Sequence, residues 1–207
     1  MHIQHKPWLI TVFTCITMLV ALSGLALAAE FSADVIMKGD PVFGQGKVWV
    51  KGQKMRQEMG DQAGKMIMIM DLDQGFHWLL MPESKTYMKT EIDTKGEGFT
   101  PESFTGTHQG PMEAEVERLG TETVNGYTCD KYLVTFKDKN MGTMTQWFSK
   151  KLDYPIKMIN KSSMMGEVVT ELKNIKIGGV EDALFQIPPG YTEMKLPQIP
   201  QMPVINQ

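Results

Sequence analysis

The chain has 207 residues, a formal net charge of −3 and 22% charged residues, values typical of a globular protein. This weakly acidic balance argues against nucleic-acid binding, because nucleic-acid-binding surfaces concentrate basic residues. Only two cysteines are present, and Cys15 lies in the N-terminal apolar run described next. The remaining chain keeps Cys129 alone and cannot form an internal disulfide, so we interpret Cys129 as a small buried hydrophobe.

Residues 1–28 have the features of a secretory signal peptide. Lys6 precedes an apolar run from Trp8 to Leu27, and Ala26–Ala28 supplies a small-x-small cleavage site. We therefore expect cleavage near Ala28/Ala29 and export of the rest of the chain. No later apolar run approaches the roughly 18 residues of a spanning helix, so we expect no transmembrane segment in the mature chain.

Residues 29–195 are predicted to form one mainly β domain, followed by a Pro-rich tail over residues 196–207. Short runs of strand-forming residues alternate with turn signals such as Asn125-Gly126, and no βαβ alternation interrupts them. These features predict a curved antiparallel sheet of about ten strands, with minor helix over Val180–Phe185. The expected strands cover Phe31–Lys38, Gly46–Lys51, Lys54–Met59, Lys65–Asp71, Gly75–Met81, Lys85–Thr90, Ala114–Thr123, Tyr127–Lys137, Thr143–Lys150, Pro155–Lys161 and Glu167–Ile177.

Two segments outside the strands carry functional hypotheses. Thr94–Pro111 is rich in Gly, Thr, Ser and Glu and is predicted to be a long loop, which we interpret as a mobile cover. The tail repeats proline at every third residue from Pro197 to Pro203, the period of a polyproline II helix. A docking ribbon and a plain chain terminus are both compatible with this tail.

The central strands are predicted to be apolar on both faces. Side chains alternate across a strand, and neither parity class of Lys65–Asp71 or Gly75–Met81 is polar throughout. Such strands suit a sheet covered on both sides or a curved sheet that encloses an apolar space. We expect that space to be the ligand-binding site and to be lined by Val48, Val50, Met66, Met68, Met70, Trp78 and Leu80.

The alternating row Met66, Met68 and Met70 has three interpretations. Methionine is unbranched and polarizable, so the row suits either an ordinary core or a deformable wall for acyl chains. Thioethers also bind Cu(I). Successive sulfurs would lie about 7 Å apart along one extended strand, however, which disfavours copper for this row alone. We expect no metal site and no cofactor.

Catalytic motifs are absent from the sequence. There is no G-x-S-x-G elbow, no HExxH and no nucleotide-binding glycine pattern. The alternating Glu113, Glu115 and Glu117 are typical of the solvated face of a strand. We therefore expect a binding protein and not an enzyme.

Several segments resemble the periplasmic lipoprotein carrier LolA and the uncharacterised exported LolA-like domains. They are Gly44–Lys51, Asp73–Trp78, Lys85–Tyr87, Asn125–Tyr132 and Val180–Tyr191. The resemblance implies a LolA- or LppX-like half-open antiparallel barrel that holds acyl chains on its concave face, in the periplasm. Gly52 stands where the carrier has an arginine used for cargo transfer, and the nearest arginine here is Arg56.

Two functions follow as hypotheses. The first is a soluble periplasmic carrier of a lipid, a lipidated protein or another long apolar ligand. The second is a non-catalytic interaction module of the cell envelope, with a filled core and a protein partner.

Overall fold

The computed structural model describes residues 30–39, 43–61, 64–91 and 113–194. The expected signal peptide, the Thr94–Pro111 loop and the Pro-rich tail lie outside the described residues. The elements are β1 (Glu30–Gly39), β2 (Phe43–Lys51), β3 (Lys54–Asp61), β4 (Gly64–Asp71), β5 (Phe76–Met81), β6 (Thr86–Glu91), β7 (Ala114–Val124), β8 (Tyr127–Phe136), β9 (Thr143–Ser149), β10 (Tyr154–Ser162), β11 (Gly166–Ile177), the 3-10 helix η2 (Asp182–Phe185) and β12 (Thr192–Glu193).

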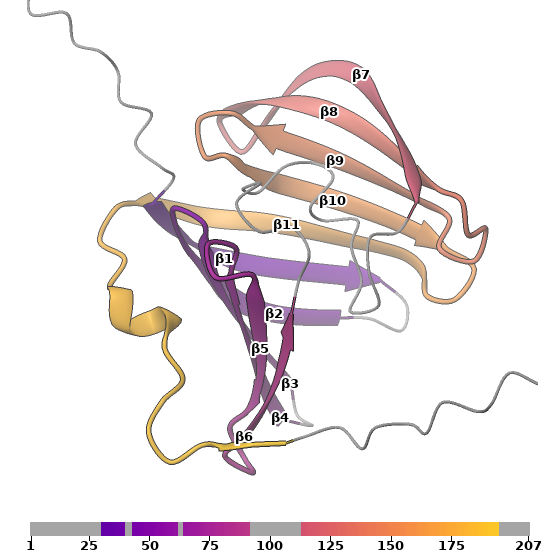
Figure 1. Ribbon diagram of the computed structural model, residues 1–207. Helices are drawn as coiled ribbons and strands as arrows, with labels where there is room; N and C mark the ends of the chain where they lie inside the picture. The colour runs from indigo at the N-terminus through magenta and orange to yellow at the C-terminus, as the bar shows by residue number, and fades with distance from the viewer. Residues whose placement is uncertain (1–29, 40–42, 62–63, 92–112, 195–207) are drawn as a thin grey trace, which may run out of the picture.

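The strands of the described residues form one twelve-stranded sheet in the order β12-β6-β5-β4-β3-β2-β1-β11-β10-β9-β8-β7. Two antiparallel meanders, β1–β6 and β7–β11, join where β11 pairs with β1 (Figure 1). A bulge between Ser32 and Asp34 interrupts that junction, and another lies between Pro155 and Lys157 in β10. Bulges bend the strands that contain them and increase their twist, which helps to curve the sheet.

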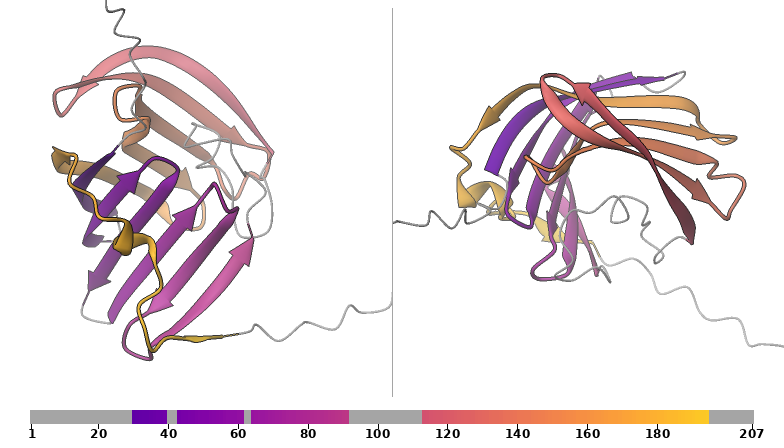
Figure 2. Two further views of the ribbon diagram at one scale, coloured as in Figure 1. Left: turned by 60° about the vertical axis from the view of Figure 1, so that its left-hand side comes forward. Right: turned by 90° about the horizontal axis from the view of Figure 1, so that it is seen from above.

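The sheet curves into an arch, and η2 lies on its outer side against β3 and β4 (Figure 2). We call the side that η2 covers the outer face and the opposite side the concave face. The mainly β fold and the half-open curved sheet expected from the sequence are confirmed. The expected helical turn is present as η2, whereas the two-residue strand β12 had no signal in the sequence.

The segment Val180–Tyr191, which we call the strap, is fixed to the outer face by polar contacts. Lys51 Nζ donates to the Val180 carbonyl at 3.1 Å, and Arg56 Nη1 donates to the Leu184 carbonyl at 2.9 Å. Beyond the strap, β12 pairs in parallel with β6 at the edge of the sheet. The strap therefore connects the middle of the sheet to its β6 edge.

The strap also buries an apolar cluster on the outer face. Phe185 of η2 is 7% exposed and packs with buried Ile67, Ile69 and Leu80, while Trp49, Trp78, Tyr87 and Tyr191 surround them. Burying a large aromatic side chain of this kind contributes roughly 2–3 kcal/mol to stability. The outer faces of β4 and β5 can be apolar because the strap covers them.

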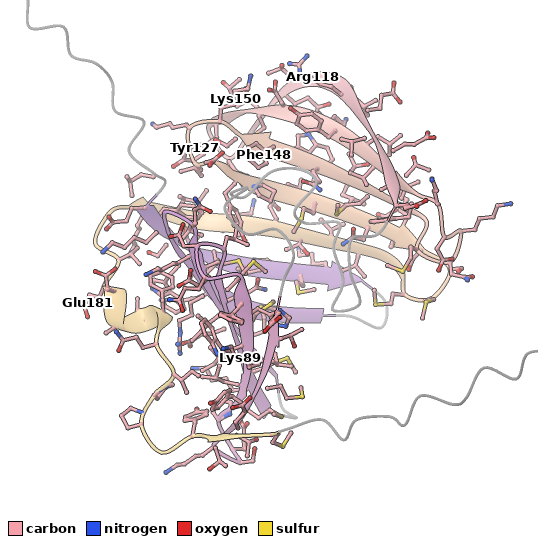
Figure 3. The ribbon with its side chains drawn as sticks, viewed as in Figure 1. Lys89, Arg118, Tyr127, Phe148, Lys150 and Glu181 are labelled. Atoms are coloured by element: carbon pink, nitrogen blue, oxygen red, sulfur yellow. The ribbon has the colours of Figure 1, made fainter. Side chains whose placement is uncertain are left out.

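A charged cluster joins the strands at the other end of the sheet. The carboxylate of Asp130 on β8 is buried and accepts hydrogen bonds from Arg118 Nη2 at 2.6 Å and Thr121 Oγ1 at 3.1 Å. Lys150 Nζ lies 3.0 Å from its second oxygen, and Arg118 and Lys150 both project from the β7–β9 end of the molecule (Figure 3). These hydrogen bonds lower the pKa of Asp130 to about 2.

We predict that Phe185→Ala lowers the free energy of unfolding by about 3 kcal/mol, because it empties the apolar cluster under the strap. Exposed Ile177 supplies the control, and Ile177→Ala should change stability by about 0.5 kcal/mol or less. Urea denaturation followed by tryptophan fluorescence measures both values. Equal stabilities of the two variants would show that the strap does not hold the outer face.

We predict a pH-dependent stability difference between wild type and Asp130→Asn. The folded pKa of Asp130 lies below its usual value near 3.9, so the carboxylate stabilises the fold above that value and loses this effect as pH falls toward 2. The difference in unfolding midpoint should be constant above about pH 5 and shrink between about pH 4 and pH 2. Glu117→Gln, at an exposed position on β7, is the matched control, and a similar pH-dependent difference there would contradict the assignment.

Candidate functional site

The register of β2–β5 defines which side chains share the concave face. Directly opposed residues on neighbouring strands lie on the same face of a sheet, about 4.5–5.5 Å apart at Cβ. One row across this face is Val50, Met55, Met70 and His77, and the next is Val48, Gln57, Met68 and Leu79. In the following row Met66 lies opposite Met59. Three adjacent rows of the concave face therefore contain methionine.

The structure divides the residues that the sequence suggested for the ligand site. Val48, Val50, Met66, Met68 and Met70 share the concave face through these rows. Trp78 and Leu80 lie on the outer face, because they are opposite Ile69 and Ile67 under the strap. Alternation shows which residues of one strand share a face. Which of the two sets on the neighbouring strand lies on that same face depends on the register between the strands.

Methionines that the sequence analysis did not select also lie on the concave face. The registers place there Met37, Met55, Met59, Met88, Met144 and Met158, in addition to the row on β4. Met59 lies over β2, where a Cβ on Gly46 would come within 2.6 Å of its sulfur. If the expected strands Lys54–Met59 and Lys65–Asp71 are assumed to form a hairpin with a short connection, the sequence alone predicts that Met59 pairs with Met66.

The charged residues of β1–β6 are at outer positions, except Asp61 at the end of β3, which the register pairs with Gly64 in line with Met59. The other concave positions of these strands hold only apolar residues, Gly, Thr, Gln57 and His77. The outer positions hold Glu30, Asp34, Lys38, Lys47, Lys51, Lys54, Arg56, Glu58, Lys65, Asp71, Lys89 and Glu91. The concave face of this half of the sheet therefore carries no carboxylate, ammonium or guanidinium group at these other positions.

The concave face is closed at one end and accessible at the other. Val48 and Val50 are 0% exposed, in a cluster where the rings of Phe31 and Tyr154 meet edge to face at 5.5 Å. Along β4 the exposure increases from half-buried Met70 to Met66, which is 51% exposed. A long apolar ligand would therefore contact the face from the Met66 end.

The outer face beside the strap is polar. Glu58 accepts hydrogen bonds from Arg56 and lies 2.6 Å from Lys65 Nζ. Burial alone would raise the pKa of Glu58, but the hydrogen bonds from Lys65 and Arg56 lower it overall. A shallow groove of about 830 Å³ runs beside them, between Asp34 on β1 and Glu83 in the β5–β6 turn. Arg56, the arginine nearest to the carrier's position, thus fixes Glu58 and the strap.

Reactive groups are scarce in the part of the chain that the structure describes. Burial raises the pKa of the Cys129 thiol, which opposes thiolate formation. No group of three or more His, Cys, Asp or Glu residues there could hold a metal ion. The described residues also contain no helix long and apolar enough to cross a membrane.

Solved structures with this fold have little sequence identity to the chain. An uncharacterized conserved protein from Thermus thermophilus is 9% identical at a TM-score of 0.57, over 82% of this chain and 91% of that one. PNGF-II is 12% identical at a TM-score of 0.53, over 81% of this chain, which spans only 31% of PNGF-II. At these identities the likeness shows the fold alone.

A LolA superfamily protein from Nitrosomonas europaea is also among the similar structures. It is 11% identical at a TM-score of 0.37, over 77% of this chain and 90% of that one. The superfamily suggested by the sequence is thus among the structural neighbours, and we draw no functional argument from a likeness of this size.

Sequence comparison supplies the family. No curated protein matches the chain. A family model described as a domain of unknown function, DUF4412, matches residues 35–154, which is more than half of the chain. The protein belongs to the DUF4412 family.

Proposed function

We propose that this protein is a non-catalytic periplasmic carrier that holds a long apolar ligand, such as a lipid or the acyl chains of a lipidated protein, on its concave face. The observation that carries the proposal is the lack of charged residues at the concave positions of β1–β6 over residues 30–39, 43–60 and 64–91, while the outer positions of the same strands are rich in charge. Its contact residues are Met66, Met68 and Met70, which are backed by the buried Val48 and Val50.

The composition of this face supports an adaptable apolar ligand. Methionine has three rotatable bonds and a polarizable sulfur, so neighbouring thioethers can adjust to chains of different shape. An exposed apolar surface that continues into a buried cluster is typical of an interaction site and not of a surface meant for water. The partial exposure of Met66 and Met68 gives such a chain its contact surface.

The export expected from the sequence is compatible with the same function. The predicted signal over residues 1–28 would deliver the chain to a compartment in which apolar molecules must cross water between membranes. A curved β-sheet can shield such a molecule from water by binding alone, without catalysing a reaction. The scarcity of reactive groups among the described residues agrees with a binding role.

A protein-interaction module is the second candidate, and the outer groove favours it. Asp34, Lys47, Glu58, Lys65 and Glu83 line this groove and would suit a polar segment of a partner protein. In this function the concave face would be a filled core. Chemical crosslinking in cells would then capture a partner through lysines of the groove, with no lipid in the complex.

We predict that Met66→Glu weakens the uptake of an uncharged pyrene-labelled long-chain alcohol by about ten-fold or more, because the ligand would have to bury a charge at the accessible end of the face. Met164→Glu, at a turn methionine that is 76% exposed, should bind the probe like wild type. Fluorescence titration gives the Kd of each. No saturable uptake by wild type, or an equal loss in both variants, would contradict the proposal.

A further inference from the structure

Two methionines and a histidine form a cross-strand row at the buried end of the concave face. Met70 on β4 is directly opposite Met55 on β3 on one side and His77 on β5 on the other. Cross-strand partners lie about 4.5–5.5 Å apart at Cβ, which is less than the spacing of about 7 Å along one strand. Three potential ligand atoms can therefore converge above Met70.

The members of this row are shielded from water. Met55 is 3% exposed, His77 is 4% exposed and Met70 is half-buried. The Tyr154 hydroxyl donates a hydrogen bond to Met55 Sδ at 3.0 Å, which restrains the thioether at one end of the row. A thioether sulfur has two lone pairs, so this hydrogen bond leaves one for another partner. A metal site in which one coordinating side chain is already restrained loses less conformational entropy when the ion binds.

The ligand chemistry selects the ion. Two thioethers and one imidazole form a soft set, which favours Cu(I) over Zn²⁺, Mg²⁺ or Ca²⁺. The described residues offer no carboxylate or thiolate cluster that would attract those harder ions. Imidazole binds a metal through one ring nitrogen, so the second nitrogen of His77 can keep a hydrogen bond.

We propose that Met55, Met70 and His77 form a binding site for one Cu(I) ion at the buried end of the concave face. Such a site goes beyond apolar-ligand binding and does not depend on it, because it needs only the register of β3, β4 and β5. The ion would be held without redox chemistry, by three neutral ligands in a water-poor environment.

The test is an anaerobic Cu(I) titration of the full chain, without added lipid, against a chromophoric Cu(I) chelator. Wild type should remove one equivalent of Cu(I) from the chelator. Met70→Leu, which nearly conserves the side-chain volume, should bind at least about ten-fold more weakly. Met158→Leu changes a half-buried methionine of the same face in another row and should bind like wild type.

A second readout in wild type keeps the proposal testable if Met70→Leu fails to fold. With methyl-labelled methionine, Ag(I), a redox-inert soft ion, should shift the Met55 and Met70 methyl resonances and leave that of Met158 unchanged. The proposal is overturned if wild type takes no Cu(I) from the chelator, if folded Met70→Leu equals wild type, or if Ag(I) shifts all methionines alike. Loss of lipid uptake with intact Cu(I) binding would overturn only the carrier function.

Discussion

Strands β4 and β5 are largely apolar on both faces, and the need to keep both of these faces from water governs this part of the architecture. The strap meets it on the outer face, where Phe185 covers Ile67, Ile69 and Leu80. On the other face, part of the requirement is met by curvature, which brings Phe31, Met55 and Tyr154 together at the closed end. The apolar surface around Met66 stays exposed at the accessible end, and an apolar ligand would cover it there.

The charge distribution follows from the same constraint. The strap is attached through its carbonyl oxygens, which accept hydrogen bonds from Lys51 and Arg56, so the cations that hold it must lie at outer positions. The concave positions of β1–β6 carry no carboxylate, ammonium or guanidinium group over residues 30–39, 43–60 and 64–91. Their thioethers are compatible with two different ligands, an apolar chain at the accessible end and a soft metal ion at the closed end.

Local patterns in the sequence predicted the strands, the β-hairpin at Asn125-Gly126 and the single turn of helix, because these depend on alternation and turn residues. Alternation also predicted that Val48 and Val50 share one face of β2, and that Met66, Met68 and Met70 share one face of β4. Local patterns could not show that Trp78 and Leu80 lie on the face opposite to these methionines, because that depends on the register between β4 and β5. The Met55, Met70 and His77 row likewise exists only after β3, β4 and β5 pair.

The central claim is that the concave face holds an apolar molecule. Native mass spectrometry of the protein isolated from the cells that produce it tests the claim most directly, because a bound molecule appears as added mass on the folded chain. The account predicts a lipid-sized adduct that is lost in Met66→Glu and retained in Met164→Glu. Wild-type protein that carries no adduct and gains none after incubation with lipids extracted from the same cells would contradict the claim.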